Sequence, residues 1–153
     1  MPTHAEKRVL PHTPAQLFEL VADVEKYPEF LPWCVAVRIR KREAAPADEG
    51  GGELLLADMA IGFKVFRERF STRVVCQMPD RIDVAYMDGP FRYLNNHWVF
   101  TPAGDGHCEI DFYVDFEFRS AILQKAIGLV FNEAVQKMVN AFEVRARALY
   151  SAD

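Results

Sequence analysis

The sequence has no long hydrophobic run. No apolar stretch approaches the roughly 20 residues that span a bilayer. The first residues, Met1 to Arg8, lack both the apolar core of a signal peptide and the Arg- and Ser-rich character of a transit peptide. We therefore expect a cytoplasmic protein.

Cysteine, histidine and the common catalytic motifs are also sparse. The three cysteines, Cys34, Cys76 and Cys108, are far apart and form no CxxC pair, so we expect reduced and mostly buried thiols. The four histidines are scattered, without an HExxH pattern or a Cys/His cluster, which argues against a metal site. GxSxG, GxGxxG and Walker sequences are absent, and we predict no catalytic residue.

The chain lacks an excess of positive charge. Lys and Arg number 18 against 22 Asp and Glu, and the net charge of −4 argues against nucleic acid, and against DNA in particular, as the default partner. A local basic patch is still compatible with this charge. The 153 residues are half hydrophobic, which is ordinary for a globular protein. We predict a single domain over residues 1–153, large enough for a core with a hollow in it.

The clearest pattern lies in the last third of the chain. Apolar and polar residues alternate from Glu109 to Phe118, which predicts a strand with one buried face. Ser120 then stands where a helix N-cap belongs, and with no Pro and only Gly128 beyond it, a helix of roughly 30 residues is predicted. Its apolar side is wider than one flat contact requires, which suits a helix gripped by a curved sheet. That side comprises Leu123, Ile127, Val130, Phe131, Ala134, Val135, Met138, Val139, Phe142 and Leu149.

The preceding segments indicate more strands separated by turn residues. We expect a strand at residues 3–10, a helix that begins at Pro14 with Thr13 as its N-cap, and at most one helical turn in residues 27–34. Further strands are predicted from Val35 and at residues 53–60, 63–77, 81–87 and 92–101, with a hairpin loop at 43–52 and a connection at 61–62. This order indicates the α+β class, an antiparallel sheet with its helices on one face.

Three segments resemble a known family. They are YPEFLPWC (27–34), GPFRYLNNHWVF (89–100) and VDFEFRSAILQKAIGLVFNEAVQKMVNAFEVRA (114–146). They resemble the coenzyme Q-binding START-domain family of the polyketide cyclase-like superfamily, whose bacterial members are also known as ribosome-association toxins. The resemblance covers nearly the whole chain. It implies the helix-grip fold (START/Bet v 1-like), an antiparallel sheet wrapped around a long C-terminal helix.

The resemblance also implies a function. It predicts a pocket for the polyprenyl quinone ubiquinone between sheet and long helix, in a quinone carrier or chaperone that supports respiratory electron transfer without being an enzyme itself. Two alternatives stay open. One is an aromatic polyketide cyclase or hydratase, although such a site needs several convergent acid and base groups. The other is a ribosome-associating protein that blocks subunit joining.

Two polar residues interrupt the apolar face that alternation assigns to the inside of the sheet. These are Glu68 and Asn96, and we interpret them as hydrogen-bonding groups for a ligand head group. The alternative is that Glu68 lies at a rim in a salt bridge, or that a bulge reverses the register.

Rigid aromatic and aliphatic side chains could line a tunnel for an isoprenoid tail, although any one of them taken alone is more often plain core. With the two polar residues, the predicted ligand-binding set is Phe30, Leu31, Pro32, Trp33, Phe63, Phe66, Glu68, Phe70, Leu94, Asn96, Trp98, Ile127, Val130, Phe131 and Met138. Gly128 is expected to weaken the helix turn beside this set, or else to allow close packing against a loop.

Arginines alternate along two predicted strands. Arg38, Arg40 and Arg42, together with Arg67, Arg69 and Arg73, predict a basic outer sheet face. Acidic residues on another strand (Glu109, Asp111, Asp115 and Glu117) could balance it as a solvated, partly paired surface. The alternative is docking to anionic lipid, with a peripheral contact at the inner membrane, or to ribosomal RNA.

Overall fold

The computed structural model describes residues 3–31, 34–47, 50–63 and 66–150. Within them the chain forms one seven-stranded sheet of order β1-β7-β6-β5-β4-β3-β2, with antiparallel pairing between neighbours. The elements in chain order are β1 (Thr3–Leu10), α1 (Pro14–Ala22), η1 (Val24–Lys26), α2 (Tyr27–Phe30), β2 (Cys34–Ala44), β3 (Glu53–Phe63), β4 (Phe66–Gln77), β5 (Arg81–Asp88), β6 (Phe91–Pro102), β7 (Cys108–Phe118) and α3 (Ala121–Tyr150). The predicted α+β helix-grip fold is confirmed.

Both long helices begin at the predicted caps. Ser120 Oγ accepts a hydrogen bond from the Leu123 amide at 3.2 Å, at the start of the 30-residue helix α3. At α1, Thr13 Oγ1 accepts from the Gln16 amide while Gln16 Oε1 accepts from the Thr13 amide, a reciprocal capping box. The caps satisfy amide groups that have no partner inside the helix, and for this reason each helix begins directly after its capping residue.

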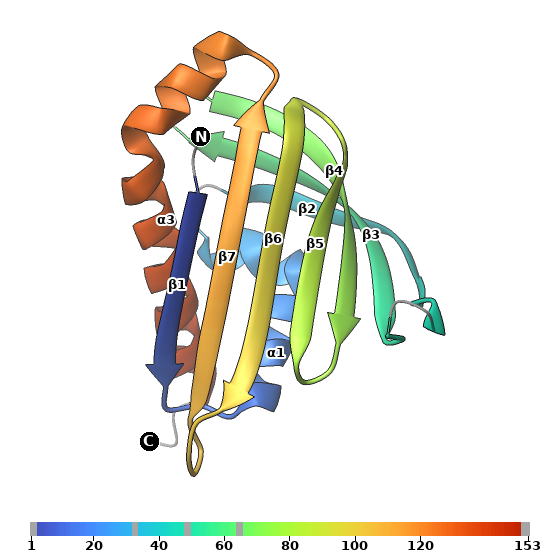
Figure 1. Ribbon diagram of the computed structural model, residues 1–153, viewed down its shortest axis with the longest axis vertical. Helices are drawn as coiled ribbons and strands as arrows, with labels where there is room; N and C mark the ends of the chain where they lie inside the picture. Colours follow the sequence, from blue (N-terminus) through green and yellow to red (C-terminus); the bar gives the residue numbers. More distant parts are fainter. Residues whose placement is uncertain (1–2, 32–33, 48–49, 64–65, 151–153) are drawn as a thin grey trace.

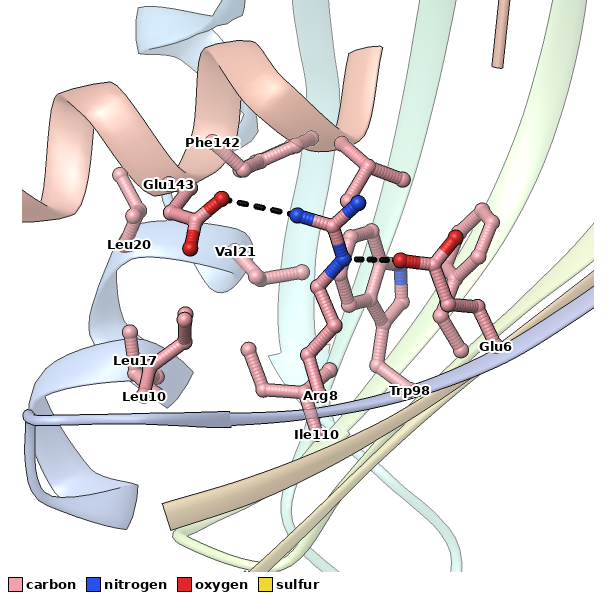
Figure 2. Close-up of a pocket in the computed structure, with 12 residues that line it drawn as sticks. Glu6, Arg8, Leu10, Leu17, Leu20, Val21, Trp98, Ile110, Phe142 and Glu143 are labelled. Carbon is pink, nitrogen blue, oxygen red and sulfur yellow. Dashed lines mark hydrogen bonds and ion pairs between the residues drawn. The ribbon is translucent and has the colours of Figure 1, made fainter. Parts of the chain in front are cut away.

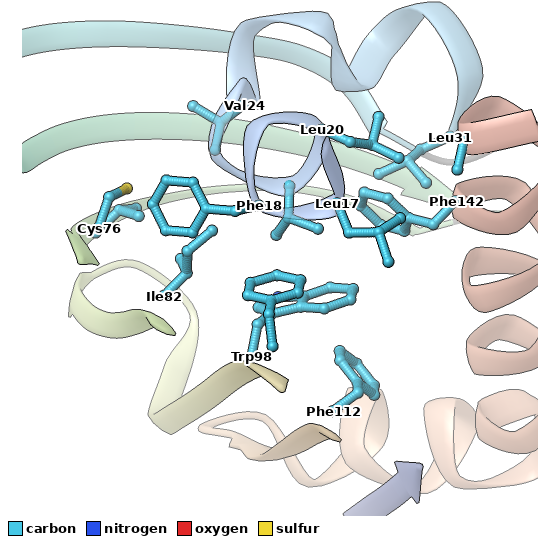
Figure 3. Close-up of a cluster of buried hydrophobic side chains, with 14 of the residues drawn as sticks. Leu17, Phe18, Leu20, Val24, Leu31, Cys76, Ile82, Trp98, Phe112 and Phe142 are labelled. Carbon is cyan, nitrogen blue, oxygen red and sulfur yellow. The ribbon is translucent and has the colours of Figure 1, made fainter. Parts of the chain in front are cut away.

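The helices gather on one face of the curved sheet (Figure 1). Helix α3 lies along the β1–β7 side, and α1 crosses behind the middle strands. Their apolar side chains meet those of the sheet in one core, drawn in Figure 3: Leu17 and Phe18 come from α1, Ile82 and Trp98 from the sheet, and Phe142 from α3. Edge-on aromatic contacts join the layers, with ring centroids 6.0 Å apart for Phe18 and Phe100 and 5.1 Å apart for Trp98 and Phe142.

The connection predicted at Ile61 and Gly62 is wrong, because β3 continues to Phe63. Ile61 pairs with Glu68 and Gly62 with Arg67 in the ladder to β4. A side chain at Gly62 would meet the Arg67 guanidinium and a Val35 methyl group. The glycine therefore marks a close approach inside a strand and not a turn.

The row of arginines on β2 does not share one face. The ladder between β2 and β3 shifts between Ile39 and Lys41, so the strand changes parity there. Arg40 Nε lies 2.9 Å from Asp58 Oδ1 on the outer face, whereas Arg42 pairs with Leu55, an inner residue, and reaches Glu25 of η1 at 3.0 Å. The prediction that Arg42 continues the outer basic row is therefore wrong.

The apolar side of α3 is nearly as broad as predicted, because nine of its ten predicted residues are buried or half-buried. Its buried residues are Phe131, Ala134, Val135, Phe142 and Ala146. Leu149, which we assigned to the apolar side, is 51% exposed. Ile122 and Leu129 are more than 80% exposed near the start of the helix. The exposed apolar residues therefore lie outside the predicted side, apart from Leu149.

Candidate functional site

A cavity of about 210 Å³ lies inside the grip of the sheet and α3. Strands β3 to β7 form its floor, α3 forms one wall, and the segment around η1 and α2 closes it. Its lining is almost wholly apolar and consists of Val24, Tyr27, Leu31, Cys34, Met59, Ile61, Glu68, Phe70, Val74, Ile82, Val84, Phe91, Leu94, Asn96, Trp98, Phe112, Val114, Phe116, Phe118, Ile127, Phe131, Ala134, Val135, Met138 and Phe142. Such a surface favours an apolar ligand, because burying its carbon atoms removes them from water.

The cavity is elongated. The strand ladders place Asn96 level with Val84 and Val74, whereas Glu68 lies six residues before Val74 on β4. At about 3.3 Å per residue, that separation is up to about 20 Å along the strand. The two polar residues therefore lie apart along the strands, and they belong to β4 and β6, which are not neighbours in the sheet.

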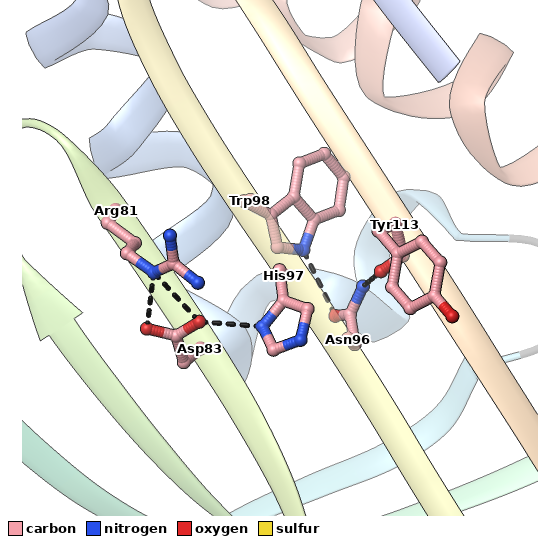
Figure 4. A network of polar contacts seen from close by, with 6 residues as sticks. All are labelled: Arg81, Asp83, Asn96, His97, Trp98 and Tyr113. Carbon is pink, nitrogen blue, oxygen red and sulfur yellow. Dashed lines mark hydrogen bonds and ion pairs between the residues drawn. The ribbon is translucent and has the colours of Figure 1, made fainter. Parts of the chain in front are cut away.

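Asn96 is already engaged by its neighbours. Its side-chain carbonyl accepts a hydrogen bond from the Trp98 indole at 3.1 Å, and its amide donates to the Tyr113 carbonyl at 2.9 Å (Figure 4). Trp98 is 5% exposed and its ring lines the cavity. The arrangement makes Asn96 a residue that orients Trp98, because an indole N–H buried among apolar groups needs an acceptor.

His97, which stands between Asn96 and Trp98 in the sequence, points to the other side of the sheet. His97 Nδ1 lies 2.7 Å from Asp83 Oδ1, and Arg81 Nε lies 2.8 Å from the same carboxylate (Figure 4). Partial burial raises the pKa of Asp83, but hydrogen bonds from Arg81 and His97 bring that pKa below its usual value. This network lies on the outer face of the sheet. Successive side chains of a strand point to opposite faces, so the network does not border the cavity.

Glu68 is different from Asn96. Its half-buried side chain lines the cavity, and it makes no hydrogen bond or ion pair with any residue in the described part of the chain. The salt bridge that we considered as an alternative is therefore not present among these residues. A carboxylate beside apolar walls costs free energy unless something pairs with it, so Glu68 is the polar group of the lining that is free to meet a ligand.

The remaining polar groups of the lining are held in neutral form. The Tyr27 hydroxyl donates to the Val21 carbonyl, and burial raises its pKa. Burial likewise raises the pKa of Cys34 to about 11. Both groups therefore behave as parts of the wall at neutral pH, and neither is prepared to act as a base or a nucleophile.

Most of the predicted site residues lie on the cavity. They are Leu31, Glu68, Phe70, Leu94, Asn96, Trp98, Ile127, Phe131 and Met138. Phe30 and Val130 are not part of the lining: Phe30 packs edge-on against Tyr27 and Phe142. Pro32 and Trp33 fall outside the described residues, as do the side chains of Phe63 and Phe66.

One wall of the cavity is formed by residues that were not in the predicted ligand-binding set. Phe112, Val114, Phe116 and Phe118 of β7 all face inwards, as does Phe142 of α3. The alternation of residues 109–118 predicts this wall, because it assigns the β7 residues to the buried face of the strand. The face that we predicted to be buried therefore also bounds the cavity.

A smaller hollow of about 30 Å³ lies behind the aromatic wall of Trp98, Phe112 and Phe142 (Figure 2). Arg8 of β1 closes it at the edge of the sheet, with one guanidinium nitrogen 2.8 Å from Glu143 of α3 and another against Glu6. The charged side chains cover the seam between β1 and α3, so the lateral edge of the core is shielded from water.

Two classes of site find no support in the structure. Among the described residues no group of three or more His, Cys, Asp and Glu side chains is placed to hold a metal ion. Nor is any helix in these parts of the chain both long and apolar enough to cross a membrane.

Comparisons with known proteins agree with this architecture. The chain is 38% identical to the ribosome association toxin RatA of Rickettsia prowazekii, over 92% of each chain, and 30% identical to the mitochondrial coenzyme Q-binding protein COQ10 homolog B of Xenopus laevis, over 96% of this chain and 59% of that protein. Among solved structures, the 18 kDa protein CC1736 of Caulobacter crescentus is 38% identical and superposes with a TM-score of 0.79 over 99% of this chain and all of that one. The Zhui aromatase/cyclase of Streptomyces shares the fold at 14% identity, with a TM-score of 0.80 over 99% of this chain and 97% of that chain.

These comparisons confirm the resemblance drawn from the sequence. The family model described as polyketide cyclase / dehydrase and lipid transport matches residues 10–143, which is most of the chain. The match extends from the end of β1 into the last third of α3, so it includes the strands and the helix that bound the cavity. The chain belongs to the polyketide cyclase / dehydrase and lipid transport family.

Proposed function

We propose that this protein binds a polyprenyl quinone, or a closely related prenylated ring, in the cavity between the sheet and α3, and serves as its carrier in support of respiratory electron transfer. The observation that carries the proposal is the elongated apolar cavity with a single unpaired carboxylate in its lining. The name of the COQ10 relative, a coenzyme Q-binding protein, supports the choice of ligand.

The size of the cavity limits what enters it. An apolar cavity of about 150 Å³ already holds a benzene ring. The 210 Å³ present here, drawn out over up to about 20 Å, suits a ring with a short length of tail or a tail segment one chain wide. Each buried methylene contributes about 0.8 kcal/mol, so a few isoprene units are enough for useful affinity. The remainder of a long tail has to leave the cavity or displace α3.

Binding without turnover is the better account of the lining. A cyclase or hydratase site needs several acid and base side chains that converge on one substrate, and an asparagine cannot serve as one of them because its amide does not titrate. Glu68 and Asn96 stand far apart, and Tyr27 and Cys34 are held neutral. We therefore propose a carrier and not a cyclase.

Extraction of the purified protein tests the proposal. Organic solvent should release a prenylated quinone or phenol that absorbance and mass spectrometry identify, at about one molecule per chain. The variant Ile127→Glu, which places a second carboxylate in the lining, should release much less, whereas Gln136→Glu on the exposed side of α3 should not. Recovery of no prenylated ligand, together with no binding when one is added, contradicts the proposal.

Ribosome association is a second candidate function. Several relatives are named ribosome association toxin RatA, and the outer face of β2 and β4 carries Arg38, Arg67 and Arg69, which form no ion pair within the described residues. Such a surface suits an RNA backbone. Co-sedimentation with ribosomes that is lost in Arg67→Glu/Arg69→Glu, and kept in the matched reversal Lys137→Glu on α3, supports this candidate. Absence of co-sedimentation for the wild-type protein argues against this candidate, and co-sedimentation that survives both changes argues against Arg67 and Arg69 as the binding surface.

A further inference from the structure

We infer that the head group of the ligand donates a hydrogen bond to Glu68, so the preferred ligand is a prenylated phenol or hydroquinone and not the corresponding quinone or an acidic lipid. The inference rests on the proposed function and narrows its ligand class. Glu68 lies on the inner face of β4, opposite Ile61 of β3 and two residues from Phe70, and both neighbours also line the cavity.

No cation of the described lining faces this carboxylate. Arg67 and Arg69, its neighbours in sequence, are exposed and occupy the opposite face of β4, as the alternation of a strand requires. Arg8 is held between Glu6 and Glu143 at the smaller hollow. Among the described residues, the lining of the main cavity contains neither Lys nor Arg. Within the described lining no side chain pairs with the half-buried carboxylate, so its hydrogen bonds are available to water or to a ligand that enters the cavity.

The chemistry of a carboxylate decides what it accepts. A carboxylate offers only hydrogen-bond acceptors. A quinone carbonyl or an ether oxygen is also an acceptor, so contact with Glu68 leaves both groups unpaired in an apolar cavity. A phenol or hydroquinone hydroxyl donates, and a hydrogen bond to a charged acceptor is stronger than a neutral one. Fatty acids and prenyl phosphates would add a second negative charge beside the first.

The geometry gives the ligand an orientation. Glu68 belongs to the end of the cavity where β3 finishes and β4 begins, next to the N-terminal half of α3 (Figure 1). Towards the other end, Asn96 is already bonded to Trp98 and Tyr113. The polar head therefore binds at Glu68, and the tail runs towards Trp98 between aromatic and aliphatic walls.

The test compares two ligands that differ in one donor. A phenol with a short prenyl tail and its methyl ether bury nearly the same apolar surface, so calorimetric titration of both isolates the hydroxyl. We expect the wild-type protein to bind the phenol about tenfold or more tightly than the ether. In Glu68→Gln the preference should fall towards one, because an amide both accepts and donates. Glu109→Gln, on the outer face of β7, should keep the wild-type preference.

Each outcome bears on the inference. If the wild-type protein binds the phenol and its ether equally, or the ether more tightly, the inference is overturned, while the proposed prenyl carrier stays intact. A phenol preference that Glu68→Gln retains shows that another group accepts the hydrogen bond, which also overturns it. Failure of the wild-type protein to bind either ligand overturns the proposed function, and the inference with it. If Glu68→Gln does not fold, Glu68→Leu takes its place, and the preference for the phenol should fall towards one there too, because leucine offers no acceptor.

Discussion

Residues on one face of α3 are not equivalent, although the sequence pattern groups them together. Ile127 lines the cavity, whereas Val130, three residues on and equally half-buried, does not. Helical rotation of about 100° per residue explains the difference, because the wall advances from Ile127 by steps of four and three residues through Phe131, Val135 and Met138. Burial alone therefore cannot identify a ligand contact.

This difference predicts the effect of a matched pair of substitutions. Ile127→Glu should lower the affinity for a prenylated ligand at least tenfold, because a second carboxylate then faces the apolar tail. The fold should survive, since a cavity that is open to ligand can also admit water. Val130→Glu should leave affinity within about twofold, as measured by titration after both variants are shown to melt cooperatively. Loss of binding in Val130→Glu alone would place the ligand on another side of the helix.

The buried thiols predict a loss of stability in alkali. Burial raises the pKa of Cys34 and of Cys76 to about 11, against about 8.5 in an unfolded chain. The contribution is therefore fully present below about pH 8.5 and is lost as the pH rises towards 11, because only the unfolded chain gives up its protons in that range. Urea unfolding between pH 8 and pH 10.5 should show this decline. The double variant Cys34→Ala/Cys76→Ala should show a shallower one, and equal slopes would contradict the assignment.

At the scale of elements, the helices were more predictable than the strands. Thr13 and Ser120 mark helix starts through hydrogen bonds to amides three residues away, and such local chemistry is legible in a sequence. The shift of β2 between Ile39 and Lys41 depends instead on its partner β3, and nothing in the arginine pattern announces it. The face of Arg42 was therefore not predictable, because strand register is a tertiary property.

Gly128 allows a prediction about the mobility of α3. It is exposed, and the space that a side chain would occupy there is open, so the alternative of close packing against a loop is wrong. Glycine inside a helix costs about 1 kcal/mol relative to alanine. Gly128→Ala should therefore raise the melting temperature by about 2–4 °C. It should also slow ligand release, if the weakened turn beside Ile127 is where the helix lifts.

A control on the same helix separates these two effects. Asn140→Ala is also an exposed change to a better helix former, twelve residues away from the weakened turn. We expect it to raise the melting temperature without slowing release, as stopped-flow displacement would show. Equal release rates for Gly128→Ala and the wild-type protein would mean that the ligand leaves by another route.

At the scale of the whole molecule, the sequence predicts the presence of a hollow better than its boundaries. The breadth of the apolar side of α3 and the alternation of the strands lead to the helix-grip fold, which the structure confirms. The separation of Glu68 and Asn96 was not predictable, because it depends on the register of β4, β5 and β6 together. Residues that alternate on one face share a side of the sheet, but only the ladder says how far apart they stand.

The dimensions of the cavity predict how affinity depends on tail length. Affinity should rise with the first isoprene units, because each buried methylene contributes about 0.8 kcal/mol, and should then level off when the 210 Å³ is filled. Phe131→Leu shortens a buried side chain of the wall, so the plateau should move to longer tails. Titration with a series of prenyl lengths measures both plateaus. A tail-less ring that binds as tightly as the prenylated ones would remove apolar burial as the source of affinity. A steady rise through the longest tails would instead require α3 to move away from the sheet and enlarge the cavity around the ligand.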